Sequence, residues 1–261
     1  MGNNRDQRLA KIIALLEQGG KLETAALSNE LGVTELTVRR DIEYLDEQGI
    51  ARRVYGGVVL NSGRSFEPPF SMRLKTNVKQ KEAMAKAVAD LIPRGANVAL
   101  DFGTKAYYLA LEMRKRHLQV LVAPTSMQAI EVLGQDSNIN VLVPGGELKP
   151  GELSLYGSAT EQFFSEHRWD VAIVSVAGVS VENDLVSDYN ETDARLKAAM
   201  VQSADRVIVL IEERHLGAVS FAPVSTLERI TTVVTDAVGP NETAAALEAK
   251  GIEVVRAMEK P

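Results

Sequence analysis

The stretch from Thr24 to Gly57 constrains the fold of this chain more than any other. Leu27 and Leu31 lie four residues apart and form the apolar stripe of a short helix. Gly32 and the residue after it make a turn, and Thr34 is placed to cap a second helix. The stretch therefore begins as two helices joined by a tight turn.

The second helix is predicted to run to residue 48 and to have one buried and one exposed face. Val38, Ile42 and Leu45 recur at the spacing of a buried stripe, and Gly49 ends the helix. Residues 50–60 then predict two short β segments closed at 55–57. The face opposite the buried stripe carries Leu36, Arg40, Glu43 and Glu47, with Thr37 and Arg39 on its flanks.

Two helices joined by a glycine-containing turn, the second one showing hydroxyls and arginines near its start, suit the DNA major groove. Arginine pairs with guanine edges or phosphates, and threonine hydroxyls suit phosphates. The alternative is a surface helix whose arginines are merely solvated. We expect DNA contacts from Thr34, Glu35, Leu36, Thr37, Arg39, Arg40, Arg52, Arg53 and Tyr55.

The same stretch resembles the N-terminal helix-turn-helix of DeoR-family transcriptional regulators. Residues 37–42 (TVRRDI), then Leu45, Gly49 and residues 53–57 (RVYGG), match that signature. Tyr55 departs from it, because many members carry histidine there. The resemblance implies a winged helix-turn-helix domain.

The composition favours a folded protein that uses neither disulfides nor thiolate metal sites, because none of the 261 residues is cysteine. The three histidines are scattered singly, so we expect no metal site and no cofactor. No secretory core or membrane-length apolar run is present, which predicts a cytoplasmic protein without a membrane partner.

The formal net charge of −6 lies mainly in the C-terminal part, and residues 1–60 are close to neutral. A near-neutral module binds DNA weakly as a monomer, which favours paired half-sites and a homo-oligomer, either a dimer or a tetramer. A first amphipathic helix, Arg5–Gln18, is stopped by the glycines at 19–20. Arg5 and Arg8 on this helix either touch phosphates or are solvated.

Residues 1–60 are thus expected to be the DNA-binding domain, 61–75 a linker rich in Ser, Gly and Pro, and 76–261 an α/β domain. In the last range, Val/Ile-rich runs alternate with helical patterns, which predicts an open, mostly parallel sheet covered by helices. The predicted strands are Asn97–Leu100, Gln119–Val122, Asn140–Val143, Val171–Val176, Arg206–Ile211, Thr231–Thr235 and Glu253–Val255. The predicted helices are Lys79–Leu91, Thr104–Lys115, Met127–Leu133, Ser158–Glu166, Glu191–Ser203 and Glu242–Lys250.

Ligands of such sheets collect at the carboxyl ends of the strands, so we looked there for a second site. Asp101, Gly103, Thr104 and Lys105 follow the first strand and open a helix whose free N–H groups favour an anion such as phosphate. The alternative is a helix cap beside an ordinary aspartate. Further polar or glycine candidates follow later strands or open later helices: Thr125, Ser126, Gly145, Gly146, Glu147, Gly157, Glu191 and Lys197.

Charged pairs in this region are open to more than one interpretation. Asp193 and Lys197 are four residues apart, and a solvent-exposed ion pair is the default interpretation for such spacing. Lys105 supplies a cation to the site or is a solvated lysine of the first helical turn.

The C-terminal half resembles the sensor domain of the DeoR family, through residues 98–104, 143–147, 156–157, 170–173 and 191–197. The resemblance implies a Rossmann-like fold similar to ribose-5-phosphate isomerase, glucosamine-6-phosphate deaminase and CoA-transferase domains. It also implies a phosphorylated sugar or related metabolite as effector. Two segments depart from the family, Pro124–Ser126 and Glu212–Gly217, where His215 replaces an expected lysine and is only partly charged near neutral pH.

We therefore predict a repressor of carbohydrate metabolism genes that binds double-stranded operator DNA and a small-molecule effector. One alternative is a sugar-phosphate isomerase or deaminase-like enzyme with an appended DNA module, in which Asp101, Glu191 and Lys197 supply acid and base groups. Another is a C-terminal domain that serves oligomerisation only.

Overall fold

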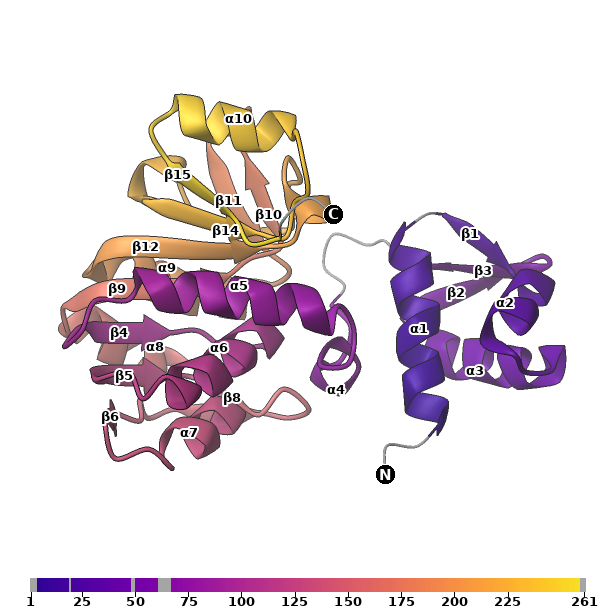
Figure 1. Cartoon of the computed structure of the whole chain (residues 1–261), viewed down its shortest axis with the longest axis horizontal. Coiled ribbons are helices and arrows are strands. Elements are labelled where there is room, and N and C mark those ends of the chain that lie inside the picture. Colours follow the sequence, from indigo (N-terminus) through magenta and orange to yellow (C-terminus); the bar gives the residue numbers. More distant parts are fainter. Residues whose placement is uncertain (1–3, 19, 48–49, 61–66, 259–261) are drawn as a thin grey trace. The chain divides into compact units, whose positions relative to one another are not determined.

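The computed structural model describes residues 4–18, 20–47, 50–60 and 67–258 and divides into two compact units, 1–78 and 79–261 (Figure 1). Gly19 and Gly49, the predicted helix stops, and most of the predicted linker (61–66) lie outside the described residues. Each unit has its own apolar core, and each is described here by itself.

The N-terminal unit packs helices against a small antiparallel sheet of order β1-β3-β2. Leu27, Val38, Ile42 and Leu45 are buried in its core, as the spacing predicts. Its elements are α1 (Asn4–Gln18), β1 (Lys21–Glu23), α2 (Thr24–Leu31), α3 (Glu35–Glu47), β2 (Ala51–Val54), β3 (Gly57–Leu60) and α4 (Phe70–Arg73).

The local geometry of the turn and the wing follows from single residues. Gly32 adopts φ 63°, ψ 33°, the left-handed conformation that ends α2. The Thr34 hydroxyl accepts a hydrogen bond from the Thr37 backbone N–H at 3.3 Å and so caps α3. β1 was not predicted, because three residues carry too little pattern. Its pairing requires Gly57, where a Cβ atom would lie 2.1 Å from the Leu22 carbonyl oxygen.

Part of the segment expected to be a linker is folded. Phe70 at the start of α4 is buried, and Met72 packs against the core of the N-terminal unit. Lys75 forms an ion pair with Asp6 of α1 at 2.9 Å. The packing of Met72 and the contacts of α4 with α1 hold this short segment on the N-terminal unit.

The C-terminal unit is built on a seven-stranded parallel sheet of order β15-β14-β12-β9-β4-β5-β6, which confirms the predicted fold class. Its strands are β4 (Asn97–Leu100), β5 (Val120–Pro124), β6 (Ile139–Val141), β9 (Trp169–Ser175), β12 (Ala204–Ile211), β14 (Thr232–Thr235) and β15 (Glu253–Arg256). Its helices are α5 (Val78–Leu91), α6 (Thr104–Lys115), α7 (Met127–Leu133), α8 (Ser158–Glu166), α9 (Glu191–Ser203) and α10 (Glu242–Ala249).

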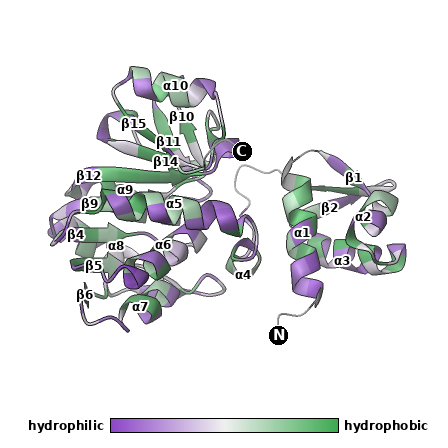
Figure 2. Ribbon diagram, in the orientation of Figure 1, coloured by the Kyte–Doolittle hydropathy of each residue, from purple (hydrophilic) through white to green (hydrophobic). Residues whose placement is uncertain are grey.

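Helices cover both faces of this sheet and form two apolar clusters. Residues of α5, α6 and α7 make one cluster, and residues of α8, α9 and α10 make the other. β12 lies between them and is hydrophobic along most of its length (Figure 2). Four helices, α6 to α9, have the predicted bounds, whereas most strand ends shift by one or two residues.

Two smaller sheets were not predicted. β7 (Glu147–Lys149) and β8 (Ser154–Tyr156) form a hairpin, and β10 (Gly178–Ser180), β11 (Leu185–Asp188) and β13 (Ala222–Ser225) form an antiparallel sheet. The chain winds from β4 outward to β6 and then returns to β9 on the other side of β4. The strand order therefore reverses between β4 and β9, which is where open α/β sheets bind ligands.

Candidate DNA-reading face and effector site

The expected DNA-contacting residues lie on the start and outward face of α3 and on the wing formed by β2 and β3. Tyr55 at the wing tip is 99% exposed, and Leu36 is 61% exposed although it is apolar. Arg39 and Arg40 are exposed on α3, as are Arg52 and Arg53 on β2. We call these residues, with Thr34, Glu35 and Thr37, the reading face.

Two arginines of the reading face are held by carboxylates. Arg39 Nη2 lies 3.1 Å from Glu35 Oε2, one helical turn earlier, and Arg53 Nη1 lies 3.3 Å from Glu43 Oε1. Within the described residues, neither Arg40 nor Arg52 forms an ion pair.

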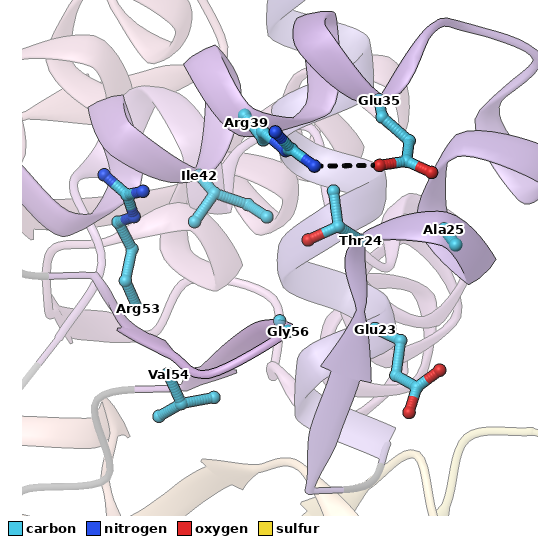
Figure 3. A pocket seen from close by; sticks show the side chains of 10 residues that line it. Glu23, Thr24, Ala25, Glu35, Arg39, Ile42, Arg53, Val54 and Gly56 are labelled. Carbon is cyan, nitrogen blue, oxygen red and sulfur yellow. Dashed lines mark hydrogen bonds and ion pairs between the residues drawn. The ribbon is translucent and has the colours of Figure 1, made fainter.

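A groove of about 340 Å³ runs between α3, the wing and the start of α2 (Figure 3). The Glu35–Arg39 pair lies on one wall of the groove, and Arg53 extends from β2 on another. The groove thus joins the carboxylate-held arginines of the helix and the wing into one continuous surface.

Asp41 anchors α3 to α1 from the opposite side of the helix. It is 1% exposed and accepts two hydrogen bonds from Arg8, at 2.5 and 3.1 Å, while Arg5 Nε lies 3.4 Å away. The Arg5 guanidinium also lies 4.7 Å from the centre of the Tyr44 ring. Arg8 is therefore not a solvated charge, because a buried carboxylate binds it, whereas Arg5 contacts the same carboxylate and remains 45% exposed.

At the carboxyl edge of the large sheet, Asp101 lies where the strand order reverses between β4 and β9, which we call the switch point. It follows β4 directly, is 1% exposed, and accepts hydrogen bonds from the Phe102 N–H at 2.6 Å and the Ser175 N–H at 2.8 Å. Ser175 ends β9, so Asp101 joins the two strands between which the order reverses.

Lys197 of α9 forms ion pairs with this carboxylate and with a second one. Its ammonium lies 3.5 Å from Asp101, donates a hydrogen bond to Asp188, and lies 4.8 Å from the centre of the Phe102 ring. Burial raises the pKa of Asp101 to about 7, against the opposing effect of Lys197. Burial also lowers the pKa of Lys197, but Asp101 and Asp188 more than offset it, so the net shift is upward and the lysine stays charged.

The prediction of an exposed ion pair between Asp193 and Lys197, made from their spacing, is wrong. Both side chains are buried, and Asp193 instead binds Lys149 of β7, with Nζ–O distances of 2.9 and 3.1 Å. Glu191, in contrast, is exposed at the start of α9, so the structure does not bring it together with Lys197.

Lys105 is not a solvated lysine, because its ammonium lies 2.9 Å from Glu212 and its side chain is only 13% exposed. Burial raises the pKa of Glu212, but Lys105 and Arg214 lower it more, so the carboxylate stays ionised. Glu212 therefore neutralises the cation that Lys105 would otherwise supply.

His215 lies near the Lys105–Glu212 ion pair, and its Nε2 is 3.4 Å from the Tyr189 hydroxyl. Burial, then the neighbouring Arg214 and Lys105, lowers the pKa of His215 to about 4. It is neutral at pH 7, whereas the sequence predicted partial charge. The expected family lysine is thus replaced by an uncharged ring.

We expect His215→Asn to make the protein less sensitive to acid. The folded-state pKa of His215 lies below its unfolded value of about 6.5, so its contribution to stability is present above that value and is lost as pH falls toward 4. Between pH 7.5 and 4.5 the variant should lose about 1–2 kcal/mol less unfolding free energy than the unaltered protein. Urea unfolding at both pH values measures this. Equal losses in the two proteins would show that His215 titrates normally.

Two helices at this edge begin without a side-chain cap. Gly103 precedes α6 with φ 92° and Gly157 precedes α8 with φ 95°, whereas Ser126 caps α7. Three buried hydroxyl oxygens in the described part of the chain have no hydrogen-bond partner, those of Thr125, Ser154 and Ser175. The backbone N–H of Thr125 donates to the Leu100 carbonyl, which places this residue beside Asp101. Unsatisfied groups of this kind suit a polar ligand.

The glycine pair after β6 has a structural explanation. Thr160 donates a hydrogen bond to the Gly145 carbonyl at 2.7 Å, and a Cβ atom on Gly146 would lie 2.0 Å from the Thr160 hydroxyl. Glu147 accepts a hydrogen bond from the Tyr156 hydroxyl at 3.2 Å across the β7–β8 hairpin. These residues hold the hairpin onto α8.

Family models match both halves of the chain. The DeoR-like helix-turn-helix domain matches residues 8–64, and the DeoR C-terminal sensor domain matches residues 76–237. This chain belongs to the DeoR family. It is a DNA-binding transcriptional regulator and not an enzyme.

Three relatives illustrate the similarity of this DeoR-family protein to known regulators. A putative aga operon transcriptional repressor of Escherichia coli O157:H7 is 32% identical, over 95% of this chain and 93% of the relative. The HTH-type regulator YulB of Bacillus subtilis is 31% identical over 95% of both chains. The glycerol-3-phosphate regulon repressor of Escherichia coli K12 is 28% identical over 90% of this chain and 92% of the relative.

Among solved structures, ribose 5-phosphate isomerase A of Methanocaldococcus jannaschii overlaps 54% of this chain and 55% of its own, at 19% identity and a TM-score of 0.39. The fold of the sensor domain is therefore assigned from its own strand order and not from this similarity. Within the described residues, no helix is long and apolar enough to cross a membrane, and no group of three metal-ligating side chains is found.

Proposed function

We propose that the reading face binds operator DNA and that the switch-point edge of the sensor domain binds a phosphorylated sugar or related metabolite. The observation that carries the first part is the exposed face of α3 and the wing, with four arginines and an exposed leucine, inside the matched helix-turn-helix domain. Two relatives are named as aga operon and glycerol-3-phosphate regulon repressors, which supports control of carbohydrate metabolism genes. A protein that binds operator DNA acts in the cytoplasm, which is the location we propose.

The chemistry of the switch point supports the effector class. Lys105, Lys149 and Lys197 each have a carboxylate partner. We therefore expect a phosphate to bind at the uncapped N-terminus of α6, at Gly103 and Thr104. Asp101 and the unsatisfied hydroxyl of Thr125 suit the hydroxyl groups of a sugar. These groups suit a small polar ligand with one anionic end.

Binding in pairs follows from the DNA geometry. Helix-turn-helix proteins bind two half-sites about one helical turn apart, so we propose a homo-oligomer, either a dimer or a tetramer. An effector changes DNA affinity only if it binds the DNA-competent and DNA-free states with different affinities.

A thermal-shift screen of phosphorylated sugars, polyols and nucleosides against the full chain tests the effector proposal. A ligand at a hundredfold excess over its Kd stabilises by about 2.7 kcal/mol. Hits are then added to gel shifts with a duplex selected from a random library by the protein. Asp101→Asn should remove the thermal shift and leave duplex binding intact. A screen without any shift would favour a sensor domain that serves oligomerisation only.

Leu36→Gln should change the base preference of the protein. An exposed leucine on a groove-facing helix packs against a thymine methyl group, whereas glutamine pairs with adenine. We expect the selected duplex to lose about 1–3 kcal/mol of binding free energy and a new base to be favoured at one position. Repeating the library selection with the variant measures this. An unchanged preference would make Leu36 an ordinary surface residue.

A further inference from the structure

Carboxylates are interleaved with the arginines of the reading face. Glu35 and Arg39 lie one turn apart on α3, whereas Glu43 and Arg53 join α3 to strand β2 of the wing. All four side chains are about half exposed, between 48 and 63%. The helix that offers cations to DNA therefore also offers anions at the same surface.

These ion pairs contribute little to the stability of the fold. Exposed pairs are worth about 0.2–1 kcal/mol, because water screens them and two long side chains lose freedom. Their effect on DNA is larger, since each carboxylate cancels one cation and repels phosphate. An arginine held in such a pair releases no counterions, and counterion release is the source of non-specific affinity.

We infer that Glu35 and Glu43 are specificity-determining residues that hold Arg39 and Arg53 away from unmatched DNA. A matched site offers each arginine a bidentate contact worth about 1–3 kcal/mol, which exceeds the strength of the pair and opens it. An unmatched site offers only phosphate, which the carboxylate opposes. The inference rests on the proposed reading face.

The near-neutral charge of the domain fits this role. The numbers of acidic and basic side chains in residues 1–60 differ by one. In the described part of the face, two of the four arginines, Arg39 and Arg53, are held in ion pairs and therefore attract the backbone of any sequence less strongly. A regulator built in this way leaves non-specific DNA readily.

The test compares Glu35→Gln and Glu43→Gln with Glu47→Gln in the full-length protein. Glu47 is a matched control, because it is exposed on the same helix and holds no arginine in the described structure. Binding is measured over a salt series to the library-selected duplex and to a duplex of the same bases in scrambled order. Glu35→Gln and Glu43→Gln should each tighten binding to the scrambled duplex about three- to tenfold and steepen its salt dependence by about one phosphate contact.

Binding to the selected duplex should tighten less than binding to the scrambled duplex in those two variants, so the ratio of affinities falls. Glu47→Gln should change both affinities less than twofold. An equal gain with Glu47→Gln would make the effect one of net charge and overturn the inference, as would unchanged binding in all three variants. Loss of affinity for the selected duplex with Glu35→Gln would show that Glu35 reads a cytosine amino group instead. The proposed reading face fails separately, if Arg39→Ala and Arg40→Ala leave binding to the selected duplex intact.

Discussion

Replacing Lys197 with methionine is expected to lower the free energy of unfolding of the C-terminal unit by about 3–5 kcal/mol. The ammonium is the cation between Asp101 and Asp188, both of which are at most 3% exposed. Methionine fills a similar volume but leaves two carboxylates in a low-dielectric interior. An uncompensated buried charge costs far more than a surface ion pair gains.

Trp169 provides the measurement for this prediction. It is the only tryptophan of the chain and is 2% exposed in the C-terminal unit, so its fluorescence follows the unfolding of that unit in urea. Lys115→Met is the control, because Lys115 is 70% exposed and 3.5 Å from its partner Glu112; it should change stability by less than about 0.5 kcal/mol. A loss below about 1 kcal/mol for Lys197→Met would show that water reaches the two carboxylates.

The loss of unfolding free energy caused by Lys197→Met should also depend on pH. The folded-state pKa of Asp101 is about 7, above its unfolded value, so the stability it contributes is full at low pH and is lost as pH rises toward 7. Removing the lysine raises that pKa further and extends the loss to higher pH. The variant should therefore be more destabilised at pH 8 than at pH 6. Adding Asp188→Asn should restore part of the loss, because only one of the two carboxylates that Lys197 contacts then remains.

The larger elements of this protein could be predicted because each carries its own local signal. Gly103 and Gly157 mark the starts of α6 and α8, while Ser126 and Asn190 are side-chain caps. Buried parallel strands are continuous apolar runs in the sequence. Such runs predict that a strand is present but do not define where it begins and ends. The strands that escaped prediction, such as β1, β7 and β10, have three residues each and are too short for any periodicity.

The ion pairs could not be predicted, because they join residues far apart in the chain. Arg8 meets Asp41 across 33 positions, and Lys149 meets Asp193 across 44. The spacing rule for helix surfaces gave the wrong partner for Lys197, since it assumes an exposed face and α9 is buried on this side. Sequence identified Asp101, Lys105 and Lys197 as candidates, but the neutralisation of each is a property of the fold.

Replacing Arg40 with alanine is expected to be the most damaging single change to DNA binding. Arg40 is exposed on α3 and, unlike Arg39, has no ion pair within the described residues, so no carboxylate offsets its removal. Removing a bidentate base contact costs about 1–3 kcal/mol. Two half-sites double this cost, so affinity for the selected duplex should fall by at least about thirtyfold, at about 1.4 kcal/mol per factor of ten. Arg168→Ala, 79% exposed in the other unit, is the control and should leave binding unchanged.

The salt dependence of the Arg40→Ala variant distinguishes two roles for this side chain. If Arg40 reads a base edge, affinity for the selected duplex falls much more than affinity for the scrambled one, and the salt slope is nearly unchanged. If it binds phosphate, both affinities fall together and the slope decreases by about one for each phosphate that the variant no longer binds. Unchanged binding to both duplexes would contradict either role and would move the reading face away from this side of α3. Because Arg40 is exposed on α3, the helix that we propose enters the major groove, we expect the first result.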